Sequence, residues 1–259
     1  MSAELNDLKI TVPLPNWPDP WVIIRPWDKL TDKYFDFESV LSVEFDLYAV
    51  RRAADPGWAD RVEGADLTAT VLMNSRLDSR DVNTVLANRP AVDIALARVP
   101  AGLDLADADL TAGGLQTALV ELFAAFRGHR VGVAKTMKVI CLKRPRLLPM
   151  LDEYVRCALY NADGMGDTTA DPMAFAVRTA DEVGLFRRIL TTDDNRRRLG
   201  LLATALSAEI ERRTGVANAV TPVRVLDNLL WFEWGGRLQF EATHGWREDL
   251  ATRTVNKPG

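Results

Sequence analysis

Basic residues are concentrated in one segment of this chain, between positions 127 and 156. Eight lysines and arginines stand there against two acidic residues, which gives the segment a charge of +6 in a chain whose net charge is −4. The rest of the chain therefore carries −10. The eight are Arg127, Arg130, Lys135, Lys138, Lys143, Arg144, Arg146 and Arg156. Such a segment can hold a phosphate backbone over a small footprint, although a charge run can equally be the solvated face of a helix.

Turn-forming residues divide this basic segment into three helices. Gly128 is placed to end the first helix and Gly132 to open the second. Backbone amides at such a turn and helix start point outward and can hold a phosphate oxygen. Pro145 and Pro149 bound the link that follows, so Asp152 is expected within the first turn of the third helix. The segment thus offers an anion site and a carboxylate close together in sequence.

These motifs resemble the helix-hairpin-helix DNA glycosylase superfamily over about residues 128–159. Gly132-Val133-Ala134 corresponds to its Gly-hydrophobic-Gly hairpin and Lys135-Thr136-Met137 to its Lys-Thr-Ala-like helix start. Leu148-Pro149-Met150-Leu151-Asp152 corresponds to its proline–hydrophobic–Asp step, although Ala134 replaces the second hairpin glycine. The chain also resembles an uncharacterised bacterial family in the pattern of Lys138, Lys143-Arg144-Pro145 and Pro149…Asp152, and in a later helix over residues 223–231.

The glycosylase resemblance implies a chemistry for particular residues. Asp152 would be the essential carboxylate, and Lys135 is the closest candidate for the lysine nucleophile of lyase-competent members, with Lys138 assisting. A carboxylate beside the sugar stabilises the positive charge that develops when an N-glycosidic bond breaks, or activates water. The residues predicted to bind DNA are Gly132, Val133, Ala134, Lys135, Lys143, Arg144 and Arg146.

The target base must leave the stack before this chemistry, so a pocket with aromatic walls is expected. Tyr154, Trp231 and Trp234 are the candidates for these walls. Each residue also has a structural interpretation. Asp152 can simply cap its helix, the lysines can be ordinary solvated residues, and the tryptophans can belong to the core. Asp227, in the middle of an apolar helix, is expected to pair with Arg224 or with a basic residue of the segment 127–156.

Composition limits the other classes of function. The chain has 259 residues, 47% hydrophobic and 26% charged, which is typical of a globular protein. With two cysteines and two histidines, it offers no four-cysteine zinc site and little for a histidine-rich one, and we predict no metal and no cofactor. The start of the chain lacks the apolar run of a signal peptide, and no stretch approaches 18 apolar residues. A cytoplasmic location without membrane contact is the expectation.

Hydrophobic spacing predicts the elements that position these residues. Residues 1–28 are rich in proline and tryptophan and predict an extended arm that packs onto the body. Helical spacing follows over residues 29–54, 66–73, 79–88, 114–126, 177–190, 195–213 and 222–234, with 90–110 left open between short helices and loop. Ser79 is the expected N-cap of one helix and Thr221, before Pro222, of another.

The sequence therefore predicts a mainly α fold, a helix-hairpin-helix glycosylase-like domain over residues 29–259 that carries the hairpin segment 128–159 behind the N-terminal arm. The expected function is DNA binding, to duplex or single strands, with cleavage of the N-glycosidic bond of a damaged or modified base. Two alternatives stay open: a module on the same scaffold that only binds nucleic acid, and a protein-interaction module that uses the Pro/Trp arm and the aromatic C-terminal helix. Oligomeric state and substrate base are not predicted.

Overall fold

The computed structural model describes residues 2–14, 21–37, 41–73, 75, 77–111, 113–127, 131–162 and 171–236. This part of the chain is mainly helical, as predicted. Its two strands, β1 (Ile10–Val12) and β2 (Trp21–Ile23), pair antiparallel with Ile10 opposite Ile23. The α-helices are α1 (Ser2–Asn6), α2 (Pro26–Thr31), α3 (Leu41–Arg52), α4 (Gly64–Ala69), α5 (Ser79–Ala97), α6 (Gly114–Phe126), α7 (Val133–Lys143), α8 (Glu153–Tyr160), α9 (Pro172–Thr191), α10 (Asn195–Thr214) and α11 (Pro222–Trp231).

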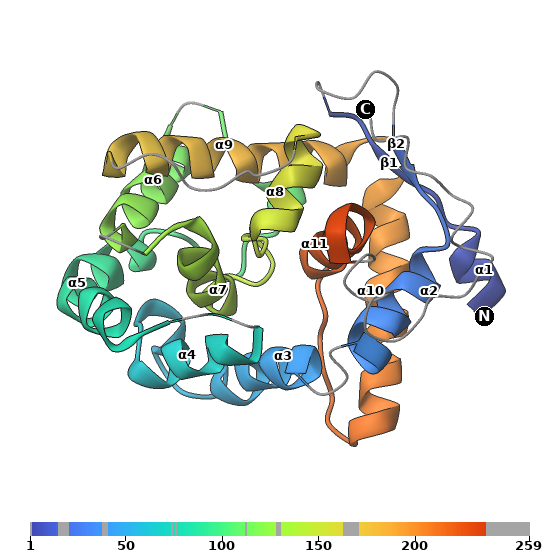
Figure 1. Cartoon of the computed structure of the whole chain (residues 1–259), viewed down its shortest axis with the longest axis horizontal. Helices are drawn as coiled ribbons and strands as arrows, with labels where there is room; N and C mark the ends of the chain where they lie inside the picture. The colour runs from blue at the N-terminus through green and yellow to red at the C-terminus, as the bar shows by residue number, and fades with distance from the viewer. Residues whose placement is uncertain are drawn as a thin grey trace.

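The helices surround a central group made of α7, α8 and α11 (Figure 1). Helix α9 runs along one edge and packs against α6, which in turn packs against α5. Helix α10 packs against α9 and α11, and α11 lies against α8. Segments that are far apart in sequence, the 133–160 region and the 222–231 helix, therefore meet in the middle of the molecule.

Regular apolar stripes explain why the longest helices form where they do. On α6, Leu119, Leu122, Phe123 and Phe126 have no exposed surface. They follow the i, i+3, i+4, i+7 spacing that keeps one face of a helix against a core. On α10, the stripe of Leu199, Leu202, Leu206 and Ile210 is equally buried. Both stripes were predicted, and both are confirmed.

Helix boundaries differ from the predictions where tertiary packing decides them. The segment predicted as one helix over 29–54 is divided into α2, a π-helical turn (Asp32–Phe37) and α3. Helix α5 continues through Pro90, because Val85, Val92 and Leu96 on either side of it are buried. That burial outweighs the roughly 3 kcal/mol by which proline disfavours a helix interior. The N-cap of α5 is Asp78 rather than Ser79, and its carboxylate accepts from the Arg80 and Asp81 amides.

The N-terminal segment is less extended than expected, since α1 is a short helix. The β1–β2 pair does pack onto the body: Ile10, Val12 and Ile23 are buried, and Trp21 contacts the core. Asn195, at the start of α10, fixes β1 by accepting from the Thr11 amide at 3.1 Å and donating to the Thr11 carbonyl at 2.6 Å. Trp17 lies outside the described residues. Among the described helices, none is long and apolar enough to cross a membrane.

Candidate functional site

Helix α7, which carries three of the eight basic residues of the segment, is an interior helix. Gly132 is its N-cap, and Val133, Thr136, Met137 and every residue from position 138 to 143 are buried. Residues 128–130, where the preceding turn was predicted, lie outside the described part of the chain. The cationic side chains of α7 therefore point largely into the protein, where each needs a partner.

Lys135 is directed away from Asp152 and toward α5. Its ammonium lies 2.6 Å from the Asp81 carboxylate, which is fully buried and also accepts from the Asp78 amide at 2.9 Å. Lys135 thus completes the N-terminal cap of α5 and does not line the pocket that contains Asp152. The structure therefore does not bring Lys135, the closest candidate for the lysine nucleophile, into the pocket that contains Asp152.

Lys143 belongs to a buried polar cluster centred on Asp66, which we call the Asp66 cluster. The Asp66 carboxylate lies 2.8 Å from the Lys143 ammonium and accepts from Tyr48, Trp58 and the Glu63 amide at 2.7–2.9 Å. The Lys143 ammonium also sits 3.7 Å from the centre of the Trp58 ring. Burial lowers the pKa of Lys143 to about 8.

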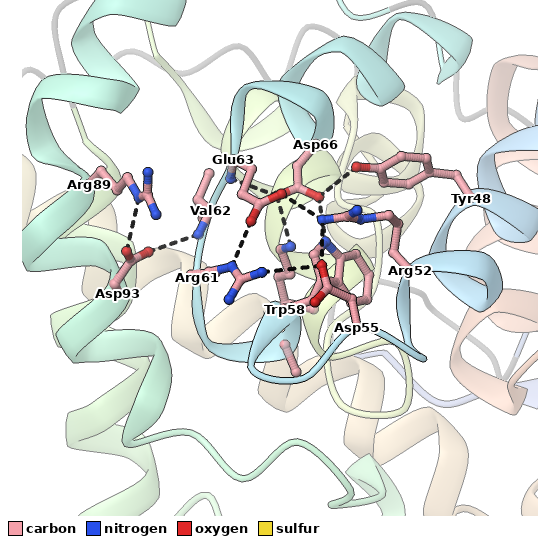
Figure 2. Close-up of polar contacts among 12 residues, drawn as sticks. Tyr48, Arg52, Asp55, Trp58, Arg61, Val62, Glu63, Asp66, Arg89 and Asp93 are labelled. Atoms are coloured by element: carbon pink, nitrogen blue, oxygen red, sulfur yellow. Dashed lines mark hydrogen bonds and ion pairs between the residues drawn. The ribbon is translucent and has the colours of Figure 1, made fainter.

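A surface layer of ion pairs surrounds the Asp66 cluster (Figure 2). Arg52 and Arg61 each contact Glu63 at 2.6 Å and Asp55 at 3.0 and 3.1 Å, respectively. This network joins the end of α3 to the start of α4. Lys143 is therefore held by the Asp66 carboxylate and the Trp58 ring, and its side chain has no exposed surface that a phosphate could contact.

Arg144 is also a structural residue. Its buried guanidinium donates to the Val99, Ala59 and Leu96 carbonyls at 2.6 Å each and lies 2.7 Å from the Asp60 carboxylate. A phosphate could reach it only by breaking these contacts, so the prediction that Lys143 and Arg144 bind DNA is corrected by their burial. Arg146 is exposed and contacts Asp104 at 3.3 Å.

Asp152 and Lys138 meet at one pocket of about 110 Å³, which we call the small pocket. The helices α7, α8 and α11 all contribute to it. Lys138 comes from α7, Asp152 precedes α8, and the remaining lining residues are Lys33, Met73, Met150, Tyr154, Val155, Arg224, Asp227, Asn228 and Trp231. The structure therefore brings together the carboxylate and one of the two predicted lysines, from positions 14 residues apart in sequence.

Both residues also have structural partners. The Asp152 carboxylate caps α8 by accepting from the Val155 amide at 3.0 Å, so the capping interpretation is confirmed. A carboxylate has about four acceptor sites, so a cap does not exhaust it. The Lys138 ammonium is buried and donates to the Met73 carbonyl at 2.5 Å. Each side chain is thus fixed in place at the pocket wall.

Two of the three predicted aromatic residues form a wall of the small pocket. The Tyr154 and Trp231 rings meet edge to face, with centres 5.8 Å apart. The Lys33 ammonium lies 3.3 Å from the centre of the Trp231 ring. A Cβ atom at Gly235 would come within 2.2 Å of the Tyr154 ring, so the ring can take this position because position 235 is glycine. Trp234 packs on the core and does not line the pocket.

Helix α11 supplies a polar face to the small pocket. Arg224, Asp227, Asn228 and Trp231 follow the spacing i, i+3, i+4, i+7, which places them on one side of the helix. The expected pairing of Asp227 is confirmed, since it lies 3.1 Å from Arg224, and it also accepts from the Met150 amide at 3.1 Å. Burial raises the pKa of Asp227 to about 7 despite these partners.

Sequence analysis missed three residues of this pocket, Lys33, Arg224 and Asn228, as functional candidates. A signal was present for the two on α11: a polar stripe at helical spacing within a run that is otherwise apolar. Lys33 gave no such signal, because it reaches the pocket from the other end of the chain through tertiary packing alone.

A second, wider cleft of about 780 Å³ lies between α3, the end of α7, α10 and residues 218–222. Apolar and small side chains provide most of its lining, and Arg224 and Asp227 line both this cleft and the small pocket. The described residues contain no group of three histidine, cysteine or acidic side chains arranged to hold a metal ion.

Comparison with known proteins places most of the chain in one family. Residues 29–234 match the model of a family described as "Family of unknown function (DUF6308)". No curated protein and no solved structure matches the chain.

Proposed function

We propose that this chain, which belongs to the DUF6308 family, binds nucleic acid and cleaves an N-glycosidic bond at the small pocket. The observation that carries the proposal is the convergence of Asp152, Lys138 and the Tyr154–Trp231 wall on one pocket. A carboxylate, a cation and aromatic surface are the groups that removal of an extruded base requires.

In this proposal Asp152 acts on the sugar. Its carboxylate stabilises the positive charge that develops on the sugar as the bond to the base weakens, or it takes a proton from the attacking water. Lys138, fixed by the Met73 carbonyl, lies on the same pocket and is available to the leaving base or to the phosphate beside the sugar. Tyr154 and Trp231 provide the apolar contact that offsets unstacking of the base.

In this proposal only part of the basic segment contacts the phosphate backbone of the nucleic acid. Lys135, Lys143 and Arg144 are engaged by Asp81, Asp66 and Asp60. The amides at the start of α7, over residues 132–134, keep the role of a glycosylase-like hairpin in this proposal. An amide contact is compatible with the burial of the Val133 side chain. The order α6, α7, α8, with Asp152 as the cap of α8, supports a glycosylase-like hairpin segment.

The test is release of bases from single-stranded and duplex DNA that carries deaminated or alkylated bases, with Asp152→Asn as the key variant. Asparagine caps a helix about as well as aspartate, so this variant should fold normally. We expect base release to fall by roughly a hundredfold or more, because the charge at the sugar is lost. Arg212→Ala, a charge change on an exposed residue away from the pocket, is the control. Release that is equal in Asp152→Asn and wild type would rule out this mechanism.

A second candidate function is binding of nucleic acid without cleavage. It is favoured by the structural partners of Asp152 and Lys138, since both side chains have roles that need no reaction. In that case DNA affinity should fall steeply with salt, while no substrate loses a base. Absence of DNA binding at low salt would exclude both functions.

A further inference from the structure

Asn228 brings an unpaired acceptor to the small pocket. The side chain is buried, and its carboxamide nitrogen donates to the Arg224 carbonyl at 2.7 Å and to the Tyr34 hydroxyl at 3.4 Å. The Tyr34 hydroxyl gives its own proton to Asp46 at 2.8 Å, so it can only accept from Asn228. These contacts fix the amide orientation. Within the described residues, no donor reaches the carboxamide oxygen.

Arg224 brings a strong donor that has a weak partner. Its Nε donates to Asp46 and its Nη1 to Asp227, both at 3.1 Å. In the described part of the chain, the one hydrogen bond of Nη2 is to the Met73 sulfur, at 3.7 Å. A thioether sulfur is a weak acceptor, whereas a guanidinium is among the strongest donors. Met73 lines the small pocket together with Arg224, so an oxygen acceptor placed there would be a better partner for Nη2 than the sulfur.

The size of the small pocket selects a single ring. An apolar cavity of about 150 Å³ is enough to hold benzene. The small pocket, at about 110 Å³, is smaller than that cavity, so it can enclose at most part of one six-membered ring and cannot enclose both rings of a purine.

Apart from Asp152, which the proposed function assigns to the sugar, the polar lining is richer in donors than in open acceptors. Arg224, Lys33 and Lys138 are cationic donors, whereas the Asp227 carboxylate already accepts from Arg224 and the Met150 amide. One neutral acceptor, the Asn228 oxygen, stands among them. The complementary ligand edge has a single N–H between two carbonyl oxygens. Cytosine and adenine edges lack this pattern, because each places an amino group beside a bare ring nitrogen.

We propose that the small pocket recognises a pyrimidine-2,4-dione ring, the ring of uracil and thymine. The Asn228 oxygen accepts the imide N–H, and Arg224 donates to a carbonyl oxygen beside it. This assignment rests on the proposed function, which makes the small pocket the site of an extruded base. Asn228 and Arg224 are then the residues that determine specificity, while Asp152 acts on the sugar.

The test is the binding of methylated bases to the full chain. Binding is measured by titration of the Tyr154 and Trp231 signals in NMR or by equilibrium dialysis. The methyl group at N1 of the pyrimidine replaces the sugar. We expect 1-methyluracil to bind, and 1,3-dimethyluracil, which lacks the imide N–H, to bind roughly tenfold more weakly or worse. We expect 1-methylcytosine to be weakened similarly, because its ring nitrogen faces the Asn228 oxygen without a proton.

Asn228→Leu, which removes the acceptor at similar volume, should erase the difference between 1-methyluracil and 1,3-dimethyluracil. Its thermal unfolding must match that of wild type, and Arg212→Ala, on an exposed residue outside the pocket, is the control. The wild-type ligand series decides the question even where this variant fails to fold. Equal binding of the two uracils, preference for 1-methylcytosine, or no binding of 1-methyluracil would each overturn the assignment. The glycosidase proposal fails separately, when base release survives Asp152→Asn.

Discussion

The Asp66 cluster and the small pocket both bury charged side chains, but they differ in how those charges are partnered. In the Asp66 cluster, one carboxylate accepts from Tyr48, Trp58 and an amide, and Lys143 completes it at 2.8 Å. In the small pocket, Arg224 has a sulfur as one partner and the Asn228 oxygen has no partner among the described residues. Buried charge alone therefore does not identify a site. Incomplete pairing beside a cavity is the feature that supports the proposed site.

The same comparison explains the basic segment. Five of its eight cations pair with acidic residues from distant parts of the chain: Lys135 with Asp81, Lys143 with Asp66, Arg144 with Asp60, Arg146 with Asp104 and Arg156 with Glu182. The excess of +6 in this segment is thus compensated within the fold by the −10 elsewhere. Charge density along a sequence does not translate into charge density on a surface.

The largest effect on stability is expected for Arg144→Met. The variant leaves the Val99, Ala59 and Leu96 carbonyls without their donor in a buried site. We expect the free energy of unfolding in urea to fall by about 3 kcal/mol or more. Arg146→Met, two residues away and exposed, should change it by no more than about 0.5 kcal/mol. Equal losses of unfolding free energy in the two variants would mean that the buried contacts of Arg144 do not stabilise the fold.

A smaller, pH-dependent effect is expected for Lys143→Met. Burial lowers the pKa of Lys143 from 10.5 to about 8, so the unfolded chain binds this proton more tightly than the folded one. Unfolding therefore takes up a proton between these two values, and the wild type should gain stability as pH rises from about 8 to 10.5. The variant should lack this gain in urea titrations at several pH values. Parallel curves for the two proteins would show that the pKa of Lys143 is not lowered.

The smallest stability effects are expected at Asp152, where a structural role and a chemical role can be compared in the same residue. Asp152→Ala removes the α8 cap and should destabilise the fold by about 1 kcal/mol, whereas Asp152→Asn should cost a few tenths. Both should reduce base release by roughly a hundredfold or more if Asp152 acts chemically. If base release in the two variants falls only in proportion to their loss of stability, Asp152 has a structural role, like the charged residues of the Asp66 cluster. Thermal unfolding and base release, measured on the same preparations, separate the two cases.

Much of the helical architecture could be predicted because it depends on local spacing. The α6 and α10 stripes, the Thr221 cap and the pairing of Asp227 with Arg224 follow from residues within one or two turns of each other. Helix α5 was predicted too short, because the burial that carries it past Pro90 depends on other elements.

The candidate site could be predicted only in part. Asp152 and Lys138 were found because they lie in one motif-bearing segment, and they share a pocket. The acidic partners of Lys135, Lys143 and Arg144 lie from 54 to 84 residues away, so the neutralisation of these cations has no local signal. Asn228 was recognisable in retrospect from its helical spacing to Arg224 and Trp231, which marks one polar side of an apolar helix.

Gly235 lies outside the small pocket, yet it sets the shape of that pocket through Tyr154. Because any Cβ at position 235 would overlap the tyrosine ring, the two positions share one volume. Evolution can enlarge one of them only by reducing the other. Relatives with alanine or serine at the position of Gly235 should therefore carry a smaller side chain at that of Tyr154, and their pockets should be wider and less aromatic. Covariation of these two positions across the family would be a record of changing ligand size.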